Sequence, residues 1–292
     1  DTAAAAWTVT AGSLHLSGKK AVYAMRGAAP LPGLDMNYLQ ASAIEIDVDS
    51  FYNRGASITV PLKKLSARER CGIILSAYGT FSMDSVLMKA SDFRLSTLFS
   101  DIHLDAAMGI GNLTSDRTLP LHLSASGSVA LADAALAFPA MAPVLRQLPS
   151  TDMAINADIS GTSGTLSVND LPARLPRFAT ISAKGSVNNP FDFDNMSGRI
   201  GIDGSMTGLN VLKPTLLEAK IAKEINIPAM TLKGAVNYNP GTVSGNLAMT
   251  AAGGRLALKA LWKEKRQGYD AELTLDSFPV NAFMPSLGVG EI

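Results

Sequence analysis

Hydrophobic and polar residues alternate with a period of two over much of this chain, and this pattern constrains its fold more than any other feature. Ile44, Ile46 and Val48, for example, alternate with acidic residues. Successive side chains of a β-strand point to opposite faces of a sheet, so such a segment predicts a strand with one apolar and one solvated face. The same alternation recurs at residues 58–62, 102–106, 121–124, 153–159, 181–184, 200–203, 256–259 and 269–276.

Short clusters of Gly, Asn, Ser and Pro separate these segments and predict turns between consecutive strands. The clusters lie at residues 53–55, 126–128, 161–164, 188–190, 239–241 and 253–254. Most intervals are too short for the helix of a dozen residues that a parallel crossover needs. The sequence therefore predicts a mainly β fold, a long antiparallel-type sheet with two or three short helices. Because a wide sheet twists, this sheet is expected to curl, with its apolar face inside.

Three segments interrupt the alternation. Residues 132–148 carry Pro139 and Pro143, which predicts a kinked or two-piece helix. Residues 171–178 are proline-rich and are expected to form no more than a single turn. The predicted order is a curled β-sheet over 1–131, a helical insertion over 132–149, sheet continuations over 150–212 and 228–292, and an amphipathic helix over 213–227.

The third interruption is the best helix of the sequence, from Lys213 to Ile225. Its apolar residues Leu217, Ile221 and Ile225 are one turn apart on one face, and Pro214 suits its first turn. The helix is expected either to cover the apolar sheet face, as a plug, or to pack against one end of a sandwich.

Composition excludes several classes of protein. The 25 Lys and Arg balance the 25 Asp and Glu, so nucleic-acid binding and a polybasic membrane patch are not expected. Charged residues make up only 17% and hydrophobic residues 47% of the chain, more apolar side chain than one solvated surface readily hides. The single cysteine, Cys71, excludes an intrachain disulfide and a cysteine-rich zinc site.

No motif predicts catalysis, a cofactor or a metal. His15, His103 and His122 each alternate with apolar neighbours and are interpreted as exposed strand residues. Glu45, Asp47 and Asp49 could line one strand face and hold calcium or serve a glycosidase, but a solvated outer face explains them better. The chain is therefore not expected to be an enzyme.

The apolar face of the sheet remains as the candidate site. The chain has 12 methionines, whose flexible side chains suit a surface that accepts variable apolar shapes, although ordinary core filling explains them equally well. The residues expected to line an apolar groove are Ile44, Ile46, Val48, Ile58, Val60, Leu62, Ile73, Leu75, Ile102, Leu104, Leu121, Leu123, Met153 and Ile155.

Two segments carry a resemblance to a known family, Leu34–Gly55 (LDMNYLQASAIEIDVDSFYNRG) and Pro61–Gly72 (PLKKLSARERCG). They resemble TamB-type proteins of the AsmA-like group, very large envelope proteins of Gram-negative bacteria. The resemblance implies a β-taco, a folded-over sheet with a hydrophobic groove. It also implies a periplasmic location, with the full-length protein anchored in the inner membrane and this chain as a middle segment.

The resemblance further implies a role in outer-membrane biogenesis. One such role is lipid transport, in which phospholipid acyl chains move along the groove between the two membranes. The other is that of the translocation and assembly module, which helps to insert outer-membrane proteins. In that case strand edges pair with the client, and an outer-membrane barrel protein is a partner of regions outside this chain. A secreted β-sandwich or β-helix enzyme is the third possibility.

Overall fold

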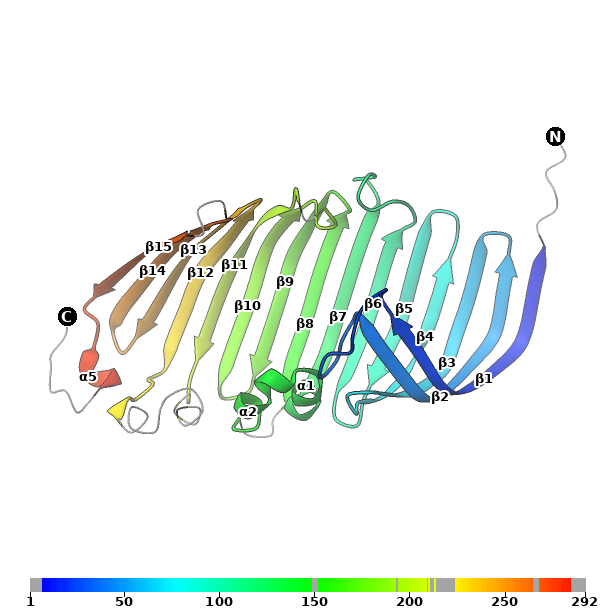
Figure 1. Cartoon of the computed structure of the whole chain (residues 1–292), viewed down its shortest axis with the longest axis horizontal. Helices are drawn as coiled ribbons and strands as arrows, with labels where there is room; N and C mark the ends of the chain where they lie inside the picture. Colours follow the sequence, from blue (N-terminus) through cyan, green and yellow to red (C-terminus); the bar gives the residue numbers. More distant parts are fainter. Residues whose placement is uncertain are drawn as a thin grey trace. The chain divides into compact units, whose positions relative to one another are not determined.

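The computed structural model describes residues 7–148, 152–192, 194–208, 210, 213, 224–264 and 268–284. Strands account for 65% and helices for 9% of the structure, which confirms the predicted mainly β class with three short helices. The strands follow one another in the sheet in chain order, and every strand pair described is antiparallel. Figure 1 shows these elements.

The chain divides into two compact units, which are described separately. Unit 1 comprises residues 1–112 and 119–146, and unit 2 comprises residues 113–118 and 147–292. The strands of unit 1 are β1 (Thr8–Ala24), β2 (Tyr38–Arg54), β3 (Ser57–Glu69), β4 (Ile74–Met83), β5 (Leu87–Ser96), β6 (Asp101–Gly109) and β7 (Pro120–Ala130). Its helical elements are α1 (Leu131–Ala137), the 3₁₀ turn η1 (Pro139–Met141) and α2 (Ala142–Leu145).

Unit 2 continues the same hairpin pattern. Its strands are β8 (Asp152–Thr162), β9 (Thr165–Leu175), β10 (Ala179–Asn188), β11 (Ser197–Met206), β12 (Met230–Asn239), β13 (Thr242–Ala251), β14 (Gly254–Lys263) and β15 (Gly268–Asp276). The helix α5 (Val280–Phe283) follows β15. Within the described residues, no helix is long and apolar enough to span a bilayer.

Two predictions from the sequence were wrong in detail. Residues 126–128 form part of β7 instead of a turn, because Gly127 lets β6 approach closely. A Cβ atom at Gly127, whose φ is +148°, would lie 2.1 Å from the carbonyl oxygen of Asp101. Residues 171–175 belong to β9, with Pro172 opposite Ser182 of β10, and only the residues after them form the turn. Proline in a strand is tolerated where the ladder does not need its N–H group.

The helical insertion confirms the two-piece prediction. α1 begins directly after β7 and ends at Ala137, with Phe138 as its C-cap. The 3₁₀ turn η1 and the helix α2 follow, with Pro139 and Pro143 in their respective first turns. Thr97 and Ser100, on the β5–β6 turn, donate hydrogen bonds to the buried carboxylate of Asp133 in α1. These bonds attach α1 to the end of the sheet.

Neither unit has the core of a two-layer protein. The described hydrophobic residues that are fully buried are few and mostly alanines. The accessible surface is 17828 Å², whereas a folded monomer of this mass is expected to expose about 12,000 Å². In the described residues of each unit the sheet is a single layer with no second sheet over its apolar face, which contributes to this excess.

Candidate functional site

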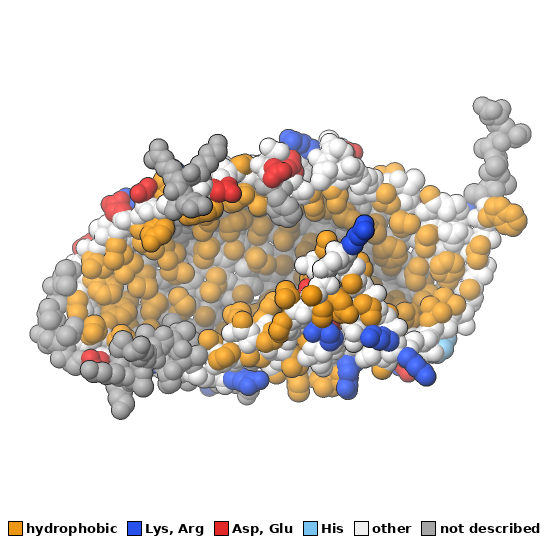
Figure 2. Space-filling view, viewed as in Figure 1, with side chains coloured by type: hydrophobic (Ala, Val, Ile, Leu, Met, Phe, Trp, Pro, Cys, Tyr) orange, Lys and Arg blue, Asp and Glu red, His pale blue; other side chains and the backbone are white. Residues whose placement is uncertain are grey.

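The apolar face of unit 1 runs without interruption across its strands. Residues paired in an antiparallel register point to the same side of the sheet. One such row begins at Val60 of β3 and continues as Phe81, Ala90, Ala106 and Leu123 on the next four strands. Figure 2 shows hydrophobic side chains gathered over this hollowed face.

The structure places the predicted lining residues of unit 1 on this one face. The rows that contain them are connected by the registers of β1 to β7. Val48 is 6% exposed and the others are half-buried, as expected for a face that is curled but uncovered. Ile73 is the one predicted lining residue of unit 1 that does not lie on a strand, because it precedes β4 in the turn. The residues on the strands are Ile44, Ile46, Val48, Ile58, Val60, Leu62, Leu75, Ile102, Leu104, Leu121 and Leu123.

Unit 2 has an apolar face of the same kind, of which the sequence predicted only Met153 and Ile155. The row that starts at Ile155 continues across seven further strands. Its members after Ile155 are Ala173, Ile181, Gly204, Leu232, Met249, Leu256 and Leu275. Ile181, Leu256 and Leu275 lie in segments whose alternation the sequence shows, although they were not named as lining residues. Ala173, Leu232 and Met249 lie on β9, β12 and β13, where Gly, Ser or Pro interrupts the alternation.

Methionines are concentrated on these faces. Met83, Met88 and Met108 are successive cross-strand partners in unit 1, and Met206 pairs with Met230 in unit 2. The flexible, polarizable thioether adapts to irregular apolar shapes. Both faces are therefore suited to an apolar ligand of variable conformation.

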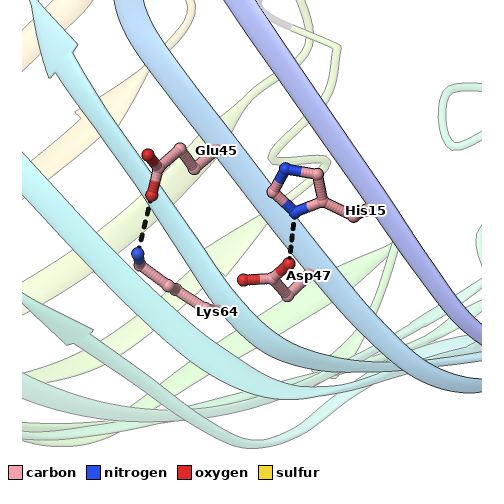
Figure 3. A network of polar contacts seen from close by, with 4 residues as sticks. All are labelled: His15, Glu45, Asp47 and Lys64. Carbon is pink, nitrogen blue, oxygen red and sulfur yellow. Dashed lines mark hydrogen bonds and ion pairs between the residues drawn. The ribbon is translucent and has the colours of Figure 1, made fainter.

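The opposite face of unit 1 is polar and carries ordered charges. On β1 to β3, the His15 ring contacts the carboxylate of Asp47 at 2.5 Å, and Lys64 donates to Glu45 at 2.7 Å (Figure 3). Asp49 lies exposed beyond them on the same strand. The carboxylates of Glu45 and Asp47 are thus each engaged by a neighbouring base on the solvated outer face.

Bonding to these bases lowers the pKa of both carboxyls. The hydrogen bond from Lys64 is the largest cause for Glu45, and the hydrogen bond with His15 is the largest cause for Asp47. A carboxyl whose pKa is lower in the folded state stabilises the fold above its unfolded pKa, about 4, and loses this effect as the pH falls through the folded pKa.

We therefore expect a small pH-dependent effect of Glu45→Gln combined with Asp47→Asn. The double variant should unfold at lower denaturant concentration than the wild type at pH 6, and the difference should shrink as the pH falls below about 4 and through the lowered folded-state pKa values. Chemical denaturation across this pH range measures it. A difference that persists unchanged at low pH would mean that packing, and not charge, is responsible; Asp49→Asn serves as the matched control.

The histidines lie on strands and are exposed, as predicted. The His103 ring is 3.8 Å from Asp92 and 3.6 Å from Asp105, and Arg94 is its cross-strand partner on β5. This cluster was not predicted, because a bulge between Ala90 and Phe93 brings Asp92 to it. Its members are solvated, and Asp105 already accepts the N–H group of Asp92.

One end of the β1–β2 hairpin leaves the sheet of unit 1. A bulge between Ser42 and Glu45, with Ala43 at φ 49°, bends β2, as bulges commonly do. Beyond the bulge, β2 still pairs with the end of β3 at Ser42 and Ala41. We call the bent end, residues 20–42, the strap. Figure 1 draws it in front of β4 to β6, and Figure 2 shows the apolar face in the same view.

The strap is fastened at two places. The N–H group of Leu34 donates to the carbonyl of Ala137 in α1 at 2.9 Å. The Arg70 guanidinium, on the β3–β4 turn, donates to the carbonyls of Leu31 at 2.6 Å and Gly33 at 3.0 Å. Because α1 follows β7, the strap connects the first two strands of unit 1 to the end of its last strand.

The predicted plug helix cannot be placed. Leu217 and Ile221 lie outside the described residues. Ile225 is described and half-buried, and its carbonyl accepts a hydrogen bond from the Lys213 ammonium at 2.6 Å. The plug role remains a prediction.

Comparisons with protein-family models, with curated proteins and with solved structures find no match for this chain. Its function is therefore inferred from the two apolar faces, the strap and the resemblance carried by the sequence.

Proposed function

We propose that this chain is a segment of a periplasmic bridge that carries phospholipid between the inner and outer membranes without catalysing a reaction. The observation that supports this most is the uncovered apolar face, which runs across β1 to β7 in unit 1 and across β8 to β15 in unit 2. A globular protein normally buries such a face against a second layer. Here an acyl chain would take that place.

The energetics favour acyl chains as the occupant. Each CH₂ group exposed to water costs about 0.8 kcal/mol, so a two-chain lipid crossing an aqueous gap faces a barrier on the order of 20 kcal/mol. A continuous apolar face removes much of this barrier. Apolar contacts have no preferred direction, so they hold a chain without fixing it at one position. Half-buried Leu, Ile and Met side chains provide such contacts.

The cellular part of the proposal comes from the resemblance to TamB-type proteins over residues 34 to 75. That part comprises the periplasm, an inner-membrane anchor outside this chain and phospholipid as the cargo. The resemblance covers β2 and β3, which carry part of the apolar face, and β2 also carries the last part of the strap.

The sheet edges favour a second candidate function, a scaffold for outer-membrane proteins. Every residue of β15 is exposed, and nearly every residue of β1 is exposed as well. An exposed edge presents unpaired backbone N–H and C=O groups, which can pair with a client strand. Photo-crosslinkers at Leu104 and at Leu273 separate the two functions: the bridge predicts lipid adducts at both, and the scaffold predicts protein adducts along β15.

The direct test of the bridge is native mass spectrometry of the chain purified from a bacterial envelope extract. We expect co-purified phospholipid, released when the protein is denatured. A chain that is folded by circular dichroism and carries no lipid, even after incubation with phospholipid vesicles, would contradict the proposal. Denatured protein taken through the same incubation is the control for nonspecific adsorption.

A further inference from the structure

The strap, the β3–β4 turn and the helical elements of unit 1 line an open pocket of about 500 Å³. This volume is in the range of small-molecule sites in proteins. Its wall includes Gly33, Cys71, Leu136, Pro139, Pro143 and Arg146. The wall is mainly apolar, and Arg146 adds a positive charge to it.

Large exposed apolar side chains lie close in the chain to residues of the pocket wall. Leu31 is 62% exposed, Phe138 56% and Met141 52%. Leu31 lies two residues before Gly33, and the other two flank Pro139 and its neighbours in the wall. A cluster of exposed apolar side chains around a concavity is typical of a surface that meets an apolar partner.

Within the part of the chain that the structure describes, Arg146 forms no salt bridge, so its charge is available to a ligand. The carboxylates of the strap, the β3–β4 turn and α1 bond to other groups. Asp35 is buried and accepts two backbone N–H groups of the strap. Glu69 accepts the backbone N–H group of Cys71. Asp133 accepts the two hydroxyl groups of the β5–β6 turn. An apolar concavity with a cation in its wall is complementary to an acyl chain that carries an anionic head.

We propose that this pocket, the strap pocket, binds the acyl chain of a phospholipid and that Arg146 pairs with the anionic phosphate of its headgroup. The inference rests on the proposed function, because it assigns to the strap pocket the step at which a lipid is held beside the apolar face of unit 1. It adds a selectivity that the apolar face does not have, a preference for an anionic head.

Cys71 provides the test, since it is the single cysteine of the chain and lies in the wall of the pocket. Burial raises the pKa of its thiol, so alkylation is followed at alkaline pH, where the fraction of reactive thiolate increases. The probe is dodecyl phosphate below its micellar concentration. We expect a saturable slowing of alkylation, about elevenfold at ten times the dissociation constant.

The charge of the head and of Arg146 provides the controls. Neutral dodecyl maltoside and inorganic phosphate should each protect Cys71 at least about fivefold less well than dodecyl phosphate, and Arg146→Glu should weaken dodecyl phosphate by about fivefold. Arg54→Glu, which changes an exposed arginine at the far end of β2, should leave the protection unchanged. If Arg146→Glu unfolds α2, the protection of wild-type Cys71 by the three probes still tests whether the strap pocket prefers an acyl chain with an anionic head.

Absent protection, equal protection by the neutral probe, or full protection by inorganic phosphate would each overturn the inference. Its failure is distinguishable from failure of the proposed function. If the chain transfers lipid along its apolar face while Cys71 stays unprotected, the proposed bridge function stands and the strap-pocket inference is wrong. Protection of Cys71 in a chain that transfers no lipid would support ligand binding in the strap pocket and contradict the proposed bridge function.

Discussion

Leu104→Arg is expected to slow the transfer of fluorescent phospholipid between donor and acceptor vesicles by about 30- to 150-fold. Leu104 lies on β6, the last strand but one of unit 1, and its cross-strand partners on the apolar face are Phe93 and Ala125. A charged side chain among acyl chains costs about 2 to 3 kcal/mol, and each 1.4 kcal/mol corresponds to a factor of about ten.

The fold should survive this substitution. Leu104 is half-buried on a face with no second layer, so an arginine can extend its guanidinium to water along the apolar surface. We expect the unfolding free energy to fall by no more than about 1 to 2 kcal/mol. Val60→Glu, on the row of β3, should act in the same way.

Ser124→Arg is the matched control for Leu104→Arg. It places the same side chain on β7, on the polar face and opposite Asp105. Transfer by this variant should equal that of the wild type. Normal transfer by a folded Leu104→Arg variant would show that lipid does not move along the apolar face, and the proposed function would then be lost.

Gly33→Val is expected to detach the strap from α1. Gly33 has φ +84°, and a Cβ atom there would lie 2.3 Å from the Ala137 carbonyl oxygen and 2.5 Å from Cδ of Pro139. These contacts are with backbone and a proline ring, which cannot move aside cheaply. Backbone strain and collision together should destabilise the strap contact by about 2 to 4 kcal/mol.

Hydrogen exchange measures this effect at defined amides. The Leu34 N–H group, which donates to Ala137, should exchange far faster in Gly33→Val, while amides in the middle of β5 and β6 keep their protection. Gly27→Val is the matched control, because Gly27 has φ +82° but no atom within 4 Å of its Cβ position. Equal exchange at Leu34 in the two variants would mean that the close approach at Gly33 does not hold the strap.

Much of the fold could be read from the alternation. Segments such as Ile44–Val48 and Ile102–Ala106 are strands because adjacent side chains of an extended backbone face opposite sides, which is a local property. The pattern was weaker where Gly, Ser or Pro interrupts it, and β1, β4, β5, β9, β12 and β13 were not singled out. Residues 126–128 were assigned to a turn because glycine marks both turns and close strand approaches.

The candidate site divides in the same way. Its lining residues on β2, β3, β4, β6, β7 and β8 could be named in advance, because alternate residues of a strand lie on the same face. The strap and its pocket could not be named, because Gly33, Arg70 and Ala137 are distant in the sequence. Only the bend of the β1–β2 hairpin brings them together.

That this chain forms strands with one apolar and one polar side follows from its amino-acid order, because the property depends on residues two positions apart. The tertiary structure alone decided that the apolar side stays uncovered in each unit and that a strap joins β1 and β2 to α1. Register, bulges and close contacts at glycine set these features, and they depend on residues that the chain brings together only when it is folded.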